Sequence, residues 1–266
     1  MHTARLSARF ARLRAEHRRA LIPYITSGFP EPAATPTLLA ALAAAGADII
    51  ELGIPFSDPL ADGPTIQRAS QLALAAGGSL DQALLALAEF RRHDADTPVV
   101  LFSYLNPILA RGTDGFLRDA VAAGADGVLL TDLPLDSDAE LEGVLDASPL
   151  AHVRLIAPTT SRERARTIAS RSQGFVYYIS RAGVTGTQGM VREQLAREVE
   201  ALRSVCALPI AVGFGISTPE QAATIARVAD GIVVGSALVE AVAGEGVEGA
   251  TRFLGGLRAA LDAINR

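Results

Sequence analysis

The sequence predicts an α/β fold, a single (β/α)8 TIM barrel with an extra N-terminal helix. Two features indicate it: short runs rich in Val, Ile and Leu recur through the 266 residues, and Ala- and Leu-rich stretches of helical period separate them. The runs are almost continuously apolar, which is typical of parallel strands covered on both faces. The predicted strands span Leu21–Thr26, Asp48–Gly53, Pro98–Ser103, Gly127–Thr131, Arg154–Ala157, Phe175–Ile179, Pro209–Gly213 and Gly231–Val234.

Helical patterns lie before the first strand and between the later ones. Leu6, Phe10 and Leu13 recur at helical spacing and predict an amphipathic N-terminal helix. Several later helices begin at a Ser, Thr or Asp, the residues preferred as N-caps. They include Thr37–Ala45, Ser79–His93, Asp114–Ala123, Ser161–Arg171 and Thr218–Val228. Because no linker divides the chain, residues 1–266 are expected to form one domain, with a helical arm over 1–19 and the barrel over 20–266.

A short repeat supports the barrel. Ala44–Asp48 and Ala122–Asp126 share the sequence Ala-Ala-Gly-Ala-Asp just before or at the start of a strand, and Ala229–Gly231 echoes it before the last one. Each copy predicts a helix end that turns tightly into a strand. The alternative is an open doubly wound sheet, but its G-x-G-x-x-G fingerprint does not follow the first strand.

Composition excludes several classes of function. The 24 cationic residues are all arginine, and the formal net charge is −5, which disfavours nucleic acid or an anionic membrane as partner. Without lysine the chain cannot form a Schiff base, so a Lys-dependent aldolase and a pyridoxal phosphate of its own are excluded. No run approaches about 18 apolar residues, and no secretory signal follows the N-terminal arginines. A lone cysteine, Cys206, suits a reducing compartment, and we expect a cytoplasmic protein.

The four histidines do not predict a metal site. His2, His17, His93 and His152 are scattered along the chain, whereas a metal needs clustered imidazoles and carboxylates. We expect solvated surface histidines and no metal.

Polar residues at the end of the second strand mark the candidate site. Barrel enzymes place their chemistry at the carboxyl ends of the strands. Glu51 lies within an apolar strand, where burial raises the pKa of a carboxyl group toward acid/base use. The long loop Ile54–Pro64 then adds Asp58 and Asp62. The alternatives are a structural glutamate paired with arginine and ordinary turn aspartates.

The run at residues 50–63, IELGIPFSDPLADG, resembles the signature of the tryptophan synthase alpha chain family. Further matches follow in order at the ends of other predicted strands, whereas the arginine-rich arm falls outside the resemblance. These matches are Pro23–Thr26, Tyr104–Pro107, Asp132–Pro134, Ser180–Gly186, Gly213–Ser217 and Gly235–Ala237.

The resemblance implies a lyase that splits indole-3-glycerol phosphate into indole and glyceraldehyde 3-phosphate by a retro-aldol reaction. Glu51 suits the proton transfers to the ring and from the hydroxyl group, and Asp62 suits the acceptance of the indole N–H. No cofactor in this chain is required. Two other hypotheses remain: a phosphosugar isomerase, and a catalytically silent paralogue that acts as an allosteric subunit.

Other loops complete the expected substrate site. We expect Gly215, Gly235 and Ser236 to bind the phosphate with backbone N–H groups, together with Gly186. The loop at residues 181–191 is expected to act as a lid that brings Thr185 to the carboxylates. Candidates for contact with the indole ring are Tyr24, Phe102, Leu129 and Phe214, and the resemblance implies a hydrogen bond between Tyr177 and Glu51.

The resemblance also implies a partner. Alpha chains of this family pair with a beta chain that carries pyridoxal phosphate, in an alpha2-beta2 heterotetramer. We expect Pro55 and Phe56 to offer apolar contacts to it, and Asp58 to pair with a basic group across the interface.

Overall fold

The computed structural model describes residues 3–179, 188–213 and 215–264, and within them eight parallel strands close into a barrel in the order β1 to β8. Every strand pairs with its neighbours in sequence, and β8 pairs with β1. The strands are β1 (Ala20–Thr26), β2 (Ile50–Gly53), β3 (Val99–Ser103), β4 (Gly127–Leu130), β5 (Ala151–Ile156), β6 (Val176–Ile179), β7 (Ile210–Gly213) and β8 (Gly231–Val234). The predicted fold class is confirmed.

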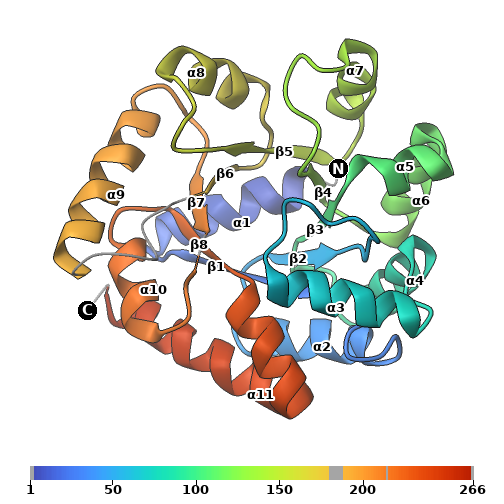
Figure 1. Ribbon diagram of the computed structural model, residues 1–266. Helices are drawn as coiled ribbons and strands as arrows, with labels where there is room; N and C mark the ends of the chain where they lie inside the picture. The colour runs from blue at the N-terminus through green and yellow to red at the C-terminus, as the bar shows by residue number, and fades with distance from the viewer. Residues whose placement is uncertain (1–2, 180–187, 214, 265–266) are drawn as a thin grey trace.

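Helices surround the barrel (Figure 1). Those before and beside the first half are α1 (Thr3–Ala15), α2 (Ala34–Ala44), α3 (Pro64–Ala75), α4 (Leu80–Arg91), α5 (Leu105–Arg111) and α6 (Thr113–Ala123). The others are α7 (Ala139–Ala147), α8 (Arg162–Arg171), α9 (Gln188–Arg203), α10 (Pro219–Ala226) and α11 (Ser236–Ala263). Three of the predicted caps form: the side chains of Ser79, Ser161 and Thr218 accept hydrogen bonds from the first turns of α4, α8 and α10. The helix starts predicted at Thr37 and Asp114 were wrong, because both residues lie inside helices, α2 and α6, that begin earlier and have no side-chain cap.

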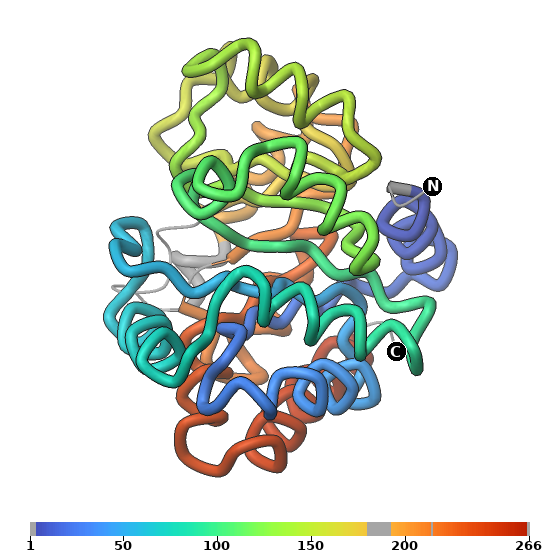
Figure 2. Tube along the Cα trace, turned by 90° about the vertical axis from the view of Figure 1, so that its right-hand side faces the viewer, coloured from blue at the N-terminus to red at the C-terminus, as the bar shows by residue number. Residues whose placement is uncertain are grey.

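The extra helix α1 closes the amino end of the barrel (Figures 1 and 2). Leu6, Phe10 and Leu13 are buried in the same cluster as the inward side chains of the strands. The ring of Phe10 lies 5.7 Å from that of Phe175 at the start of β6. The apolar face of the amphipathic N-terminal helix therefore covers the amino end of the barrel.

The repeated Ala-Asp motif has a structural role at this end. In each copy the aspartate carboxylate accepts a hydrogen bond from the backbone N–H at or near the start of an adjacent strand. The three pairs are Asp48 with Leu21 (2.9 Å), Asp126 with Val99 (2.8 Å) and Asp230 with Ile210 (2.9 Å). Arginines of neighbouring helices pair with these carboxylates: Arg258 with Asp48 (3.0 Å), Arg91 with Asp126 (2.7 Å) and Arg203 with Asp230 (3.1 Å). From α1, Arg5 reaches Asp126 (2.8 Å) and Arg9 reaches Asp48 (3.6 Å).

Two predictions in the region of β5 were wrong. The strand begins at Ala151, three residues before the predicted start at Arg154. His152, expected at the surface, is 2% exposed, and its Nδ1 atom lies 2.8 Å from a carboxylate oxygen of Asp146. Arg154 also bonds Asp146 (2.9 Å). The outward face of β5 therefore carries a buried polar network. Its polar residues interrupt the continuous apolar run from which the strand was predicted, so the predicted strand began too late.

No helix in the described part of the chain has the length and apolar character needed to cross a membrane.

Candidate active site

A cavity of about 480 Å³ opens at the carboxyl end of the barrel. The ends of several strands line it, together with the first turns of α3 and α11. The lining residues are Tyr24, Glu51, Ala61, Asp62, Gly63, Ile66, Phe102, Thr131, Leu155, Tyr177, Ile179, Gly213, Gly215, Ile216, Ser217, Val233, Gly235, Ser236, Ala237 and Glu240. The structure thus brings together eight of the residues that the sequence singled out: Tyr24, Glu51, Asp62, Phe102, Tyr177, Gly215, Gly235 and Ser236.

Four other predicted residues do not join them. Leu129 is fully buried in the barrel interior and does not line the cavity. It therefore packs the core and does not join the residues expected to contact the indole ring. Thr185, Gly186 and Phe214 lie outside the described residues. The predicted lid over residues 181–191 lies mostly outside them too.

Glu51 is fully buried on β2, beside Tyr24 of β1 and Val100 of β3 in the strand register. Neither carboxylate oxygen has a hydrogen-bond partner among the described residues. No ion pair joins Glu51 to a described arginine, so the alternative of a structural ion pair was wrong. Burial alone raises the pKa of Glu51 to about 8, because an apolar environment disfavours the charged form. The group is therefore mostly protonated at neutral pH and unpaired at the cavity wall.

Asp62 is half-buried on the loop between β2 and α3. Burial raises its pKa to about 6, and the nearby Tyr104 hydroxyl group acts in the opposite direction. The carboxyl groups of Glu51 and Asp62 thus have different proton affinities, a pattern typical of acid/base sites.

Tyr104 was not predicted as a site residue. Its hydroxyl oxygen accepts a hydrogen bond from the Ala61 N–H at 2.8 Å, and its ring lies 5.3 Å from that of Phe56. Tyr104 therefore contacts the loop that carries Asp62 at two points, Phe56 and Ala61. The sequence feature that could have identified Tyr104 was its position directly after β3, where the side chain reaches the mouth of the barrel.

Aromatic side chains form the apolar wall. The rings of Tyr24 and Phe102 meet edge to face, with centroids 5.2 Å apart. Tyr177 rises from β6, and burial, then the nearby Glu51, raises the pKa of Tyr177 well above its ordinary value. The hydrogen bond between Tyr177 and Glu51 that the resemblance implied is not formed in this structure.

Two strand-end glycines make room for these tyrosines. A Cβ atom on Gly53 would lie 2.2 Å from the Tyr24 hydroxyl oxygen, and one on Gly213 would lie 2.2 Å from that of Tyr177. Real Cβ atoms do not approach another atom so closely, so a larger residue at either position must displace the ring.

Gly213→Ala is therefore expected to lower the free energy of unfolding by about 1–3 kcal/mol, the usual cost of overpacking. Because Tyr177 must move from the cavity wall, substrate binding should weaken too. Urea unfolding and steady-state kinetics would measure both. The control is Gly143→Ala on α7, where a Cβ atom meets nothing within 4 Å; it should leave stability unchanged or higher. Equal stability of the two variants would contradict this account of Gly213.

The part of the cavity wall at the start of α11 suits an anion. Gly235 is the N-cap of α11, and its carbonyl accepts from the Leu238 and Val239 N–H groups. The first N–H groups of a helix have no partner within it, so those of Ser236 and Ala237 are available to a ligand. Gly215 adopts a φ of 66°, in the left-handed region that glycine tolerates best.

The loop expected to meet a partner is only partly exposed. Pro55 is buried, so it cannot offer the surface contact that was predicted for it. Phe56 is half-buried against Tyr104, whereas Asp58 is exposed and its carboxylate accepts a hydrogen bond from Ser57 Oγ at 2.6 Å. Leu60 is 91% exposed.

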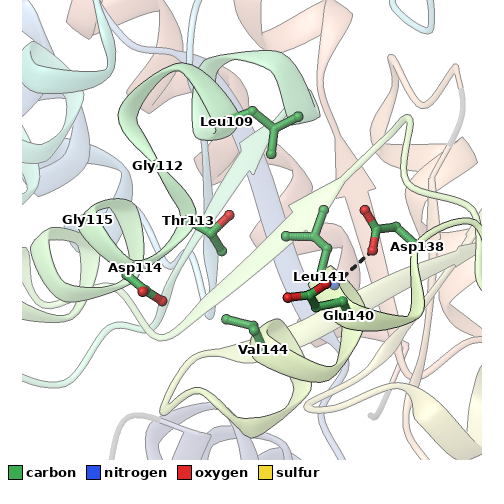
Figure 3. Close-up of a pocket in the computed structure, with 9 residues that line it drawn as sticks. All are labelled: Leu109, Gly112, Thr113, Asp114, Gly115, Asp138, Glu140, Leu141 and Val144. Atoms are coloured by element: carbon green, nitrogen blue, oxygen red, sulfur yellow. Dashed lines mark hydrogen bonds between the residues drawn. The ribbon is translucent and has the colours of Figure 1, made fainter.

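A second cavity, of about 410 Å³, lies between the α5–α6 junction and α7 (Figure 3). Leu109 approaches it from one side, and Leu141 and Val144 from α7. Its rim is acidic, with Asp114, Asp138 and Glu140, and it shares no residue with the first cavity. Its lining contains none of the residues predicted for chemistry.

Comparison with known proteins identifies the family of this chain. The family model for the tryptophan synthase alpha chain matches residues 10–254. The tryptophan synthase alpha chain of Laribacter hongkongensis is 50% identical over 262 residues, which cover 97% of this chain and 99% of the relative. That of Xanthomonas euvesicatoria is 50% identical over 264 residues, 97% and 98% of the two chains.

Solved structures extend this similarity to the fold. The crystal structure of tryptophan synthase subunit alpha from Legionella pneumophila superposes with a TM-score of 0.91 at 39% identity, covering 97% of this chain and 98% of the other. The aminoacrylate-bound tryptophan synthase from M. tuberculosis gives 0.86 at 36% identity, covering 97% and 99%. On the family match, the identities and the full-length coverage, this chain belongs to the tryptophan synthase alpha chain family.

Proposed function

We propose that this chain cleaves indole-3-glycerol phosphate to indole and glyceraldehyde 3-phosphate, with Glu51 as proton carrier and Asp62 as the partner of the indole nitrogen. Membership of the family supports the reaction. The observation that supports the roles is a fully buried, unpaired carboxyl group at the wall of the same cavity as a second, more acidic one.

The reaction needs two proton transfers around one carbon–carbon bond. Glu51 in its protonated form donates to indole C3, and the positive charge that develops on the ring nitrogen is stabilised by Asp62, which accepts its N–H. Glu51, now ionised, takes the proton of the adjacent side-chain hydroxyl group. The oxygen forms the aldehyde C=O, the bond to C3 breaks, and its electrons return to the ring. Indole and glyceraldehyde 3-phosphate leave, and Glu51 is again protonated.

The rest of the cavity orients the substrate. The apolar wall of Tyr24 and Phe102 suits the indole ring, and the start of α11 suits the phosphate. With the ring and the phosphate held in this way, we expect the bond to be broken to lie near Glu51.

A direct assay tests this function. The purified chain, with and without a beta chain, is incubated with indole-3-glycerol phosphate, and indole is measured. Release of indole is expected. Phosphosugar isomerisation without indole would support the isomerase hypothesis instead, and binding without turnover would support the silent paralogue.

The pH dependence of kcat/KM is expected to be bell-shaped, with limbs near pH 6 and pH 8. Asp62, with a pKa of about 6, must be ionised to accept the indole N–H, so activity falls as pH drops below that value. Glu51, with a pKa of about 8, must be protonated to donate, so activity falls as pH rises above it. Steady-state rates from about pH 5 to about pH 9.5 measure both limbs. A rate that stays constant above pH 8 would exclude Glu51 as the acid.

We further propose that the chain pairs with a beta chain that carries pyridoxal phosphate, in an alpha2-beta2 heterotetramer. The absence of lysine from the whole sequence supports placing that cofactor in the partner. The exposed Leu60 and Asp58 support a contact beside the mouth of the cavity.

Phe56→Ala is expected to weaken beta-chain binding about fivefold or more, because it removes an apolar side chain that also supports the loop through Tyr104. Calorimetric titration with the beta chain measures the effect. Leu85→Ala on α4, at a residue that is 62% exposed away from this loop, is the matched control. Unchanged affinity in the Phe56 variant would remove this loop from the interface.

A further inference from the structure

An acidic side chain lies at the end of the cavity that suits the phosphate. Glu240 is on the second turn of α11, exposed, and lines the cavity together with Gly235 and Ser236. Its Oε1 atom accepts a hydrogen bond from Thr65 Oγ1 at 3.0 Å. Thr65 belongs to the first turn of α3, so this bond joins the two helices whose amino ends border the cavity. This hydrogen bond restricts rotation of the Glu240 side chain and so keeps its carboxylate at the cavity.

The ionised side chains among the described residues of the cavity wall are all acidic. These lining residues include no cationic side chain, and because Glu51 is mostly protonated at neutral pH, the negative charge comes from Asp62 and Glu240. A phosphate monoester carries a charge of about −1.5 to −2 at neutral pH. Backbone N–H groups at the start of α11 attract it, whereas a carboxylate one turn further along repels it.

We propose that Glu240 is a specificity-determining residue that weakens the binding of phosphate-bearing ligands by charge repulsion. The proposal rests on the proposed function, which places the phosphate at the start of α11. Repulsion grows with the charge of the ligand, so Glu240 disfavours the dianion more than the monoanion and ligands with a second acidic group most of all. It also promotes departure of the phosphate-bearing product.

A purely mechanical role is the alternative. Thr65 follows Asp62 by three residues, so its bond to Glu240 could instead hold the loop that carries Asp62. Two substitutions separate these roles. Glu240→Gln removes the charge and keeps an oxygen that accepts from Thr65, whereas Thr65→Val removes the donor and keeps the charge.

The test compares kinetic constants for indole-3-glycerol phosphate at low ionic strength. Glu240→Gln is expected to lower KM about twofold to fivefold, with kcat within about twofold of the native value. The difference should disappear at about 0.5 M NaCl, where the Debye length is only a few ångströms. Thr65→Val should leave kcat unchanged. The control is Glu248→Gln, further along α11 with its side chain 87% exposed, which should change neither constant.

Binding of inorganic phosphate, measured by calorimetry, supplies a readout that does not depend on turnover. Tighter binding to the Glu240 variant than to the native chain supports the proposal, even if no indole is released and the proposed function fails. Equal KM values and equal phosphate affinities at low salt would overturn it. A lower kcat in Thr65→Val, with no change in Glu240→Gln, would also overturn it and assign the pair to loop positioning.

Discussion

Glu51→Gln is expected to abolish indole release, with a loss in kcat of roughly 10²–10⁴-fold, the usual contribution of general acid–base catalysis. The amide has almost the shape of the carboxyl group but can neither donate its proton to C3 nor take one from the hydroxyl group. Because the native group is mostly protonated at neutral pH, the variant preserves its charge state and should fold. Single-turnover release of indole measures the effect.

The same variant tests the unusual proton affinity of Glu51 through stability. Between pH 4.5 and about pH 8 the folded chain holds a proton that the unfolded chain has lost, so the Glu51 contribution to the free energy of unfolding falls as pH rises. This part of the pH dependence should vanish in Glu51→Gln. The control for activity is Glu142→Gln, another buried glutamate, which lies on α7 outside the cavity. Near-native turnover in the Glu51 variant would end its assignment as proton carrier.

Asp126→Ala is expected to lower the free energy of unfolding by about 3–5 kcal/mol. The carboxylate is fully buried and accepts from the Val99 N–H, and it pairs with Arg91 and Arg5. Removing it leaves the Arg91 guanidinium, only 11% exposed, without its charged partner, and it detaches α1 from one anchor. Urea unfolding followed by circular dichroism measures the loss.

Asp119→Ala on α6 is the matched control, because Asp119 pairs with Arg111 at the surface, where ion pairs contribute about 0–1 kcal/mol. Catalysis at low temperature should survive in both variants, since Asp126 lies at the amino end of the barrel and the cavity at the carboxyl end. A loss below about 1 kcal/mol in Asp126→Ala would show that the repeated motif does not carry the stability assigned to it.

Much of the barrel could be predicted because its strands are covered on both faces. That environment demands nearly continuous apolar runs, and all eight predicted runs correspond to strands. The prediction went wrong at β5, where His152 and Arg154 are buried through pairing with Asp146. A polar residue that is buried against a partner on the preceding helix looks the same, in the sequence, as one that faces water.

The candidate carboxyl group on the second strand was accessible from sequence for a similar reason. Glu51 stands out because an acidic residue inside an apolar strand is costly without a functional or structural reason. Tyr104 and Glu240 carried no such signal, because the importance of Tyr104 lies in its contacts with the loop of Asp62 and that of Glu240 in its place on the cavity wall. Leu129 was placed at the site because it lies near a strand end, yet its side chain points into the closed interior.

The order of apolar runs, the helix caps and the carboxyl group on the second strand are properties of the chain itself, since local burial and backbone preferences determine them. Which groups meet was decided only by closure of the barrel, which brings Glu51, Asp62 and the start of α11 around one cavity. It also leaves the carboxyl group of Glu51 without a partner and sets Tyr177 against Gly213. The proton affinity of Glu51 and the fit of Tyr177 depend on these neighbours, and the neighbours are residues that are distant in the sequence.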